Sequence, residues 1–319
     1  MTIKKISHKS KKNQGYTIIE IMVALLIGVM IIGTLYSFYI SSTVTNRLTN
    51  RLANIQETGR FAINIIARDI QRAGYFGGNA NIRDITGTAG ITTPTNGTCN
   101  PFGNSWATMV EQHIYGLNDT NLGYACISDL EYLRGDILTL RYASPWLVNT
   151  FDSSELYLRS SLFEGRIFLG NAEADPSNTN LAIASQTNHQ LIAHSFFIGD
   201  SGDTCKGDVI PALYWKYLKD GVPTSEMLLP GVENLQVEYG IDVTGDLSPN
   251  RYVSANDVTN WNNISTVRIY LLIKDECPDN TYTNSTTYKL GDINFTPNDN
   301  YYRLFLTSTI AIRNKLNNL

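Results

Sequence analysis

Residues 15–46 read GYTIIEIMVALLIGVMIIGTLYSFYISSTVTN, and the part from Ile21 to Asn46 contains no Asp, Glu, Lys, Arg or His. A helix needs about 20 apolar residues to cross a bilayer, and this run is long enough. A cleaved secretory signal has a shorter apolar region, of about 7 to 15 residues, and a small-residue cleavage site after it. We therefore predict a retained membrane helix at residues 16–45.

Charge predicts the orientation of this helix. The first fifteen residues contain no acid and five lysines: Lys4, Lys5, Lys9, Lys11 and Lys12. Since Lys and Arg favour the cytoplasmic side, we expect the N-terminus in the cytoplasm and the residues beyond about 45 outside. The chain after the first fifteen residues carries 20 basic and 29 acidic residues, a net charge of −9. An acidic body lacks the broad basic face of nucleic-acid-binding proteins, so nucleic acid is not an expected partner except through a local patch.

The helical pattern continues beyond the membrane segment. Small or apolar residues recur every three or four positions, which marks one face of a helix: Leu48, Leu52, Ile55, Gly59, Ile63, Ile66, Ile70 and Ala73. The predicted solvent side carries Arg47, Arg51, Glu57, Arg60, Asp69 and Arg72. We predict one helix over residues 16–73, whose half at 46–74 packs on a globular domain at 75–319. We expect the helix to end at the glycines that follow it, Gly74, Gly77 and Gly78.

The globular region has the composition of antiparallel sheet. Residues 79–135 are rich in Gly, Asn and Thr, which favours loops. Alternating Val, Ile, Tyr and Phe then predict strands at 136–143, 166–170, 191–199, 212–218, 232–243, 265–275 and 302–313. The predicted fold class is α+β, with the long N-terminal helix packed on antiparallel sheet.

Four cysteines, Cys99, Cys126, Cys205 and Cys277, follow the membrane segment. An oxidising compartment favours disulfides, and four cysteines allow three pairings. We expect Cys99 to pair with Cys126 and Cys205 with Cys277, because each pair is adjacent in sequence order within polar, loop-like surroundings. No close pair such as C-x-x-C is present to indicate a zinc site.

Two further motifs are weaker. GDSGD (199–203), near His194, is similar to a serine-protease motif, but a polar turn after a strand explains it better, and we expect no catalytic residues. IDVTGDLSPN (241–250) spaces Asp242 and Asp246 as a calcium loop does, although the glycine and glutamate of an EF-hand are missing. An Asx-rich turn is the preferred interpretation, with calcium as a weaker alternative and no other cofactor expected.

Lysines, Gly15, an aromatic residue, an apolar run and Glu20 follow one another at the N-terminus. This arrangement resembles the class III signal of type IV prepilins. In that family a membrane prepilin peptidase cuts after the glycine and methylates the new N-terminus. The resemblance implies a leader at residues 1–15, cleavage between Gly15 and Tyr16, methylation of Tyr16, and a role for Glu20 in subunit assembly.

Two other regions resemble the PilW family of minor pilins. They are ETGRFAINIIARDIQRAGYFGG (57–78) and the blocks at 228–246 and 251–274. The resemblance implies a pilin-like fold and a minor pilin that primes assembly of the type IV pilus and sits at or near its tip. The implied partners are other minor pilins, the major pilin, the prepilin peptidase, the inner-membrane assembly platform and, before assembly, the lipid bilayer.

Two alternatives stay open at this point. A type II secretion pseudopilin, GspJ, shares this architecture. An adhesive or DNA-contacting tip module would instead bind an external ligand, and the aromatic residues Tyr214, Trp215, Tyr217 and Trp261 are the candidates for such a platform. Alternating aromatics in strands more often serve core packing.

Overall fold

The computed structural model describes residues 15–87, 106–124, 126–171 and 185–314. The chain divides into two compact units, residues 1–52 and 53–319, and the helix α1 (Ile18–Arg72) contributes to both. The predicted helix over 16–73 is confirmed to within two residues at each end. Most of the predicted leader, residues 1–14, lies outside the described residues.

In the first unit, residues 15–52, the surface of α1 is apolar. Its most apolar 18-residue window has a mean hydropathy of 2.6, and no residue of that window is buried. Large side chains such as Ile18, Met22 and Val29 are more than 60% exposed. By length and composition this helix is able to cross a membrane.

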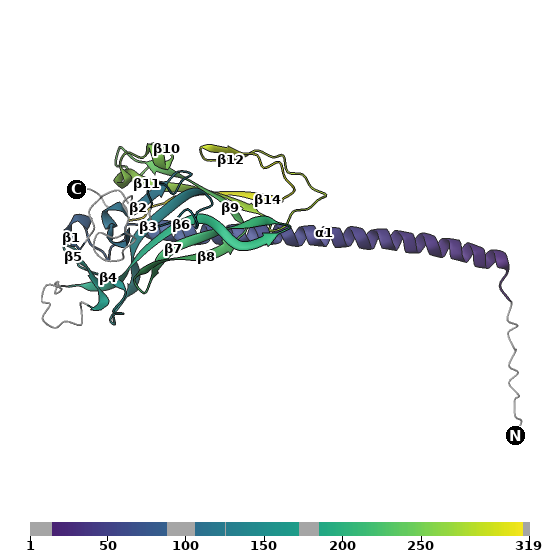
Figure 1. The fold of residues 1–319 in the computed structure, drawn as a ribbon, viewed down its shortest axis with the longest axis horizontal. Helices are drawn as coiled ribbons and strands as arrows, with labels where there is room; N and C mark the ends of the chain where they lie inside the picture. The colour runs from purple at the N-terminus through teal and green to yellow at the C-terminus, as the bar shows by residue number, and fades with distance from the viewer. Residues whose placement is uncertain (1–14, 88–105, 125, 172–184, 315–319) are drawn as a thin grey trace, which may run out of the picture. The chain divides into compact units, whose positions relative to one another are not determined.

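The second unit is built on β-strands (Figure 1). Eight strands form one sheet: β1 (Ile85–Thr86), β2 (Ile114–Leu117), β3 (Arg134–Leu147), β4 (Leu156–Ser160), β5 (Gly165–Leu169), β6 (Thr187–Cys205), β7 (Asp208–Lys219) and β8 (Val222–Pro230). Four form another, in the order β10 (Arg251–Val253), β9 (Val232–Ile241), β11 (Ile264–Lys274) and β14 (Arg303–Ala311). β12 (Tyr288–Leu290) and β13 (Ile293–Phe295) form a hairpin, and short 3-10 turns lie at Ile82–Asp84, Trp106–Thr108, Val110–Gln112, Ala255–Asp257 and Trp261–Asn263.

The α+β class and the antiparallel sheets are confirmed. Each of the seven predicted strands is present, and the pairings are antiparallel except that of β1 with β5. The sequence did not predict β4 or β8. β8 contains Pro223 and Pro230, which weaken a strand signal.

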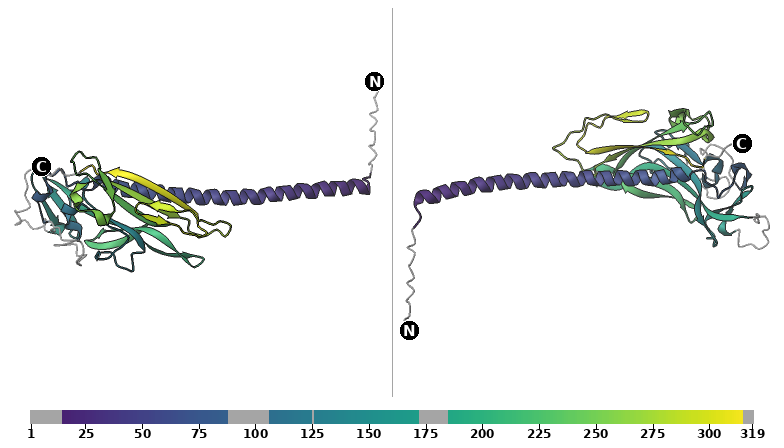
Figure 2. Two further views of the ribbon diagram at one scale, coloured as in Figure 1. Left: turned by 90° about the horizontal axis from the view of Figure 1, so that it is seen from above. Right: turned by 180° about the vertical axis from the view of Figure 1, so that it is seen from behind.

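The half of α1 that belongs to the second unit covers the core. Ile55, Ala62, Ile66 and Ile70 are at most 4% exposed and pack with side chains from both large sheets. Gly59 brings the helix close to β14, because a Cβ at this position would collide with Leu306. Figure 2 shows this part of α1 lying along the strands. The predicted apolar stripe therefore forms the core face of the helix.

The prediction was wrong for Asp69, which we expected on the solvent side of the helix. Its residue exposure is 6%, and its Oδ1 accepts a hydrogen bond of 2.7 Å from the Tyr142 hydroxyl. Its Oδ2 lies 2.6 Å from Nδ1 of His194. Both partners come from distant strands, so the local helical pattern could not reveal that this carboxylate is buried.

The predicted helix stop is confirmed at Gly74, whose φ of +78° is a left-handed conformation that favours glycine. A Cβ at Gly74 would lie 2.8 Å from the backbone oxygen of Asn314 and 3.1 Å from the His113 ring. A side chain at this position would therefore strain the backbone and push away the segment that follows β14.

Beyond Gly74, Arg141 and His113 are both buried. Arg141 is 0% exposed and donates hydrogen bonds of 2.6 Å to the backbone oxygens of Trp106 and Gln112. Burial, together with the nearby charge of Arg141, lowers the pKa of His113 to about 4. His113 is therefore neutral in the folded protein, because a second positive charge beside the buried Arg141 is unfavourable.

This burial predicts a loss of stability in mild acid. The unfolded chain takes up a proton at His113 near pH 6.5, whereas the folded chain does so only near pH 4. Stability is therefore lost as pH falls through that window, by about 3 kcal/mol for a shift of this size. Chemical denaturation between pH 7 and 4 measures it, and His113→Phe should flatten the slope. An unchanged slope in the variant would contradict the assignment to His113.

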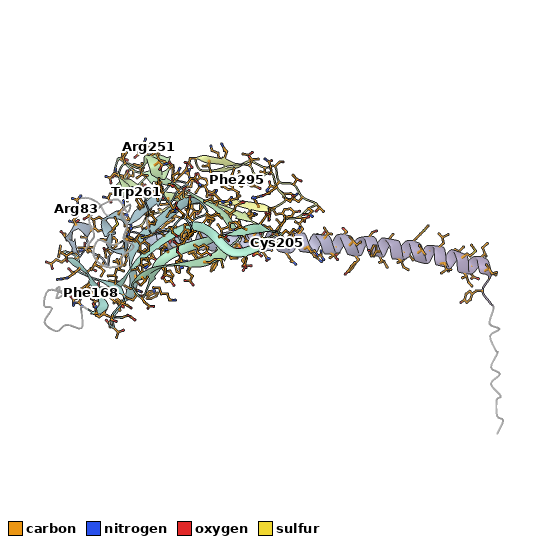
Figure 3. The ribbon with its side chains drawn as sticks, viewed as in Figure 1. Arg83, Phe168, Cys205, Arg251, Trp261 and Phe295 are labelled. Atoms are coloured by element: carbon orange, nitrogen blue, oxygen red, sulfur yellow. A yellow bond between two sulfur atoms is a disulfide. The ribbon has the colours of Figure 1, made fainter. Side chains whose placement is uncertain are left out.

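The predicted disulfide between Cys205 and Cys277 is present, with 5.4 Å between the two Cα atoms. It joins the end of β6 to the loop after β11, and Figure 3 labels Cys205 at the end of the β6–β7 hairpin. Cys126 is also disulfide-bonded, but its predicted partner Cys99 lies outside the described residues.

Candidate assembly site on the N-terminal helix

The predicted cleavage site lies just before α1. Gly15, Tyr16 and Thr17 are not helical, and α1 begins at Ile18. Tyr16 is 79% exposed, and a Cβ at Gly15 would meet no atom within 4 Å. The backbone at residues 15–16 is therefore open to a peptidase, as a cut between these residues requires.

Glu20 lies in the first turn of α1. Its backbone N–H bonds to the Thr17 oxygen at 3.1 Å, and the Thr17 hydroxyl lies 3.3 Å away, so Thr17 caps the helix start. A carboxylate near a helix N-terminus is favoured by the unpaired N–H groups there. The residues that follow Glu20 offer it no cation, because Ile21 to Asn46 contain no basic side chain.

Asp69 and His194 form an acid–imidazole pair, so the residues around it show whether it belongs to a catalytic site. The His194 ring also packs against Trp215, with 4.4 Å between ring centroids. Ser201 of the GDSGD motif is not part of this pair: it lies seven residues along from His194, in the outer part of β6, where its Oγ accepts a hydrogen bond from the Asp203 N–H at 3.1 Å. The pair joins α1 to β6. The expected polar turn after a strand was wrong, because residues 199–203 lie within β6, where its pairing with β7 shifts register between Asp200 and Thr204.

The calcium candidates lie in a turn that engages their oxygens. Oδ1 of Asp242 accepts the N–H groups of Thr244 and Gly245, at 3.1 and 2.7 Å, and its Oδ2 accepts that of Leu247 at 2.9 Å. Asp246 accepts the N–H of Ser248. In the part of the chain that the structure describes, no three His, Cys, Asp or Glu side chains are arranged to hold a metal ion. The geometry is that of an Asx-rich turn.

The four candidate aromatics do not form one platform. Tyr214 stacks on Phe197 in one core cluster, whereas Trp215 packs against His194 and Tyr217. Trp261 lies elsewhere, between the rings of Tyr115 and Tyr239, at 5.0 and 4.9 Å. Core and cross-strand packing therefore accounts for them.

The sequence did not reveal an ionic cluster at the start of β14. The Arg303 side chain is 1% exposed and binds Glu233 through two bonds of 2.6 and 2.9 Å. It also binds Asp299 through bonds of 2.6 and 2.7 Å. Its guanidinium joins β9, β14 and the loop between β13 and β14. The seventy residues that separate Glu233 from Arg303 leave no local signal for such a pair.

Known families match both ends of the chain. The model of the prokaryotic N-terminal methylation motif matches residues 10–36, which include Gly15, Tyr16 and Glu20. The model of the type IV pilus-assembly protein W, PilW, matches residues 195–314, from β6 to the end of β14. The chain is a type IV pilin-like protein with a PilW domain.

The PilW match covers β9, β11 and β14, and with them the cluster around Arg303. Among solved structures, a type IV-like pilin from Thermus thermophilus is similar, at 12% identity and a TM-score of 0.36, over 82% of this chain and 97% of that one. No curated protein matches the chain. The long apolar helix followed by antiparallel sheet is the arrangement that the sequence predicted.

Proposed function

We propose that this PilW-domain protein is a minor pilin of the type IV pilus, cut by the prepilin peptidase between Gly15 and Tyr16 and methylated on Tyr16. The observation that carries the proposal is that one chain holds both the N-terminal methylation motif and the PilW domain, and that its N-terminal helix is apolar enough to cross a membrane. Before assembly the helix lies in the inner membrane, with the domain in the periplasm.

Burial of the Glu20 carboxylate in the membrane favours assembly. A carboxylate within the bilayer costs about 2.5 to 3.5 kcal/mol at its centre, and intramembrane acids are functional by default. In a filament the apolar helices pack together, and Glu20 meets the charged amine that cleavage creates on Tyr16 of a neighbouring subunit. A buried pair of this kind fixes register more than it adds stability. The cost of the charge is offset only in the polymer.

The position in the filament follows from the same residue. The subunit that caps a pilin tip complex typically lacks this glutamate, and the present chain keeps it. We place the protein at or near the tip, where it primes assembly with the other minor pilins, because it contains a PilW domain, and beneath another subunit because it keeps Glu20.

Removing the carboxylate tests the role of Glu20. A Glu20→Ala chain is expected to be cut normally, because Gly15 is untouched, but to enter pili at least about tenfold less than wild type, as loss of a buried charged partner implies. Immunoblots of sheared pili and of membranes measure the two quantities. Glu57→Ala, an exposed acid in the second half of α1, is the control. Normal incorporation of Glu20→Ala would contradict the proposed pairing.

Deleting the gene separates pilus assembly from type II secretion. We expect few or no surface pili and unchanged protein secretion, with pili restored by the wild-type gene. Intact pili with lost secretion would reject the pilus in favour of the secretion pseudopilin.

A further inference from the structure

Three acidic side chains lie near one another beside the β12–β13 hairpin. Asp119 comes shortly after β2, Asp136 belongs to β3, and Asp292 lies in the turn between β12 and β13. Burial raises the pKa of the Asp136 carboxyl well above its usual range, and the nearby charges of Asp119 and Asp292 raise it further. Among the described residues, no lysine, arginine or histidine forms an ion pair with any of the three. The part of the chain that the structure describes therefore leaves this negative charge without a cation.

Two amide side chains beside these acids have oxygen atoms without a partner. Gln236, in β9, is 0% exposed, and its Nε2 donates a hydrogen bond of 2.7 Å to Oδ1 of Asp119. Asn118 donates a bond of 3.1 Å from Nδ2 to Oδ2 of Asp292. Oε1 of Gln236 and Oδ1 of Asn118 are buried and have no hydrogen-bond partner among the described residues. Burial of an acceptor without a partner is unfavourable, so both oxygens are suited to a bound ligand.

Asp136 holds the neighbouring groups in place and is not itself free to bind a ligand. Its Oδ1 accepts the backbone N–H of Asp119 at 3.0 Å, and its Oδ2 accepts that of Val237 in β9 at 2.7 Å. These bonds fix the segment after β2 against β9. Asp119 and Asp292 are exposed, so their carboxylates are open to an ion from solvent.

The charge and the unpaired oxygens indicate a hard cation as the ligand. A water molecule would satisfy the two amide oxygens, but it would leave the acids without an opposite charge. The donors are carboxylate and amide oxygens, which are ligands of Ca²⁺, whereas zinc sites are built mainly from Cys and His. Ca²⁺ also accepts irregular sets of about six to eight oxygens, while Mg²⁺ demands a near-ideal octahedron. Side chains from separate parts of the fold, completed by water, therefore suit Ca²⁺ best.

We propose that the carboxylates of Asp119 and Asp292 and the two amides bind one Ca²⁺ ion. A half-turn of the Gln236 amide brings Oε1 to the place from which Nε2 contacts Asp119. The ion joins the segment after β2, strand β9 and the hairpin, which belong to three different sheets. With two acids and two amides, the site is not one of the groups of three His, Cys, Asp or Glu that the described residues lack. It is also separate from the turn at Asp242.

Calcium titration of the full chain in detergent tests this site. Isothermal titration calorimetry of chelator-treated protein with CaCl₂ is expected to show one ion per chain, with a Kd of about 10⁻⁴ to 10⁻³ M, as in extracellular calcium modules. Asp119→Asn and Asp292→Asn each remove one negative charge with little change in shape, so each is expected to raise the Kd at least about tenfold. MgCl₂ is expected to bind at least about tenfold more weakly than CaCl₂.

Asp220→Asn is the matched control. Asp119 and Asp220 are both exposed, and both have a left-handed backbone, with φ of 48° and 50°. Asparagine tolerates that conformation, so the two substitutions are expected to have similar effects on the fold. Thermal unfolding then separates an ion ligand from a purely structural aspartate. Ca²⁺ should raise the unfolding midpoint of the wild type and of Asp220→Asn by the same amount, and that of Asp119→Asn by much less.

Three results would overturn the proposal. They are no Ca²⁺ binding by the wild type at about 10 mM, well above the range of extracellular sites, an unchanged Kd in Asp119→Asn or Asp292→Asn, and equal Kd values for Ca²⁺ and Mg²⁺. The second result would place the ion elsewhere, and the third would indicate general screening of exposed acids. The count of surface pili on the deletion strain tests the proposed function separately, because calcium binding does not enter that measurement.

Discussion

A Gly15→Val chain is expected to stay uncut, to keep its fifteen-residue leader and to be absent from pili. The peptidase must approach the backbone between Gly15 and Tyr16, and glycine leaves that approach open because it has no Cβ. The valine adds a branched side chain at the cut. Without the cut, Tyr16 has no free amine for Glu20 of a neighbour to meet. Intact-mass measurement of the membrane form and immunoblots of sheared pili give the two readouts.

Gly28→Val is the matched control for this prediction. Gly28 lies within the apolar half of α1, where a Cβ would meet no atom within 4 Å, and it is thirteen residues past the cut site. Its variant should be processed normally. If Gly15→Val yielded the wild-type mature mass instead, the cleavage site would have to lie elsewhere.

An Arg303→Met variant is expected to lose about 3 to 5 kcal/mol of unfolding free energy, the usual cost of breaking a buried ion pair from one side. Glu233 is 5% exposed on its side chain and has two bonds to Arg303, so methionine would leave its charge buried without that partner. Asp299, 30% exposed, can turn to water. Most of the loss therefore comes from Glu233.

Denaturant unfolding of the full chain in detergent measures this loss. Arg313→Met removes an exposed arginine ten residues further on and should change stability by less than about 0.5 kcal/mol. A double variant, Arg303→Met with Glu233→Leu, removes the stranded carboxylate and should recover part of the lost stability. Equal stabilities of Arg303→Met and Arg313→Met would show that the cluster contributes nothing.

Local patterns explain why so much of the fold could be predicted. The run without charged residues from Ile21 and the small or apolar residues that recur every three or four positions from Ile55 to Ala73 are local patterns. The structure has one helix over both. The strands with clear alternation were found for the same reason. The disulfide between Cys205 and Cys277 was predicted from sequence order, although order alone does not fix a pairing.

Contacts between distant residues explain what the sequence missed. Asp69 looked like a solvent-facing residue because its partners, Tyr142 and His194, lie 73 and 125 positions away. The cluster around Arg303 likewise depends on which strands become neighbours. The N-terminal motif is different, because Gly15, Tyr16 and Glu20 lie within six consecutive positions and can be recognised without knowledge of the fold.

The second half of α1 has a mechanical consequence. Its core side chains, from Ile55 to Ile70, line up along the helix, and Asp69 fastens its end to Tyr142 and His194. If a retracting filament pulls this helix along its axis, these contacts are loaded together in shear rather than opened one at a time. The contacts of the core face and those of Asp69 therefore share such a load.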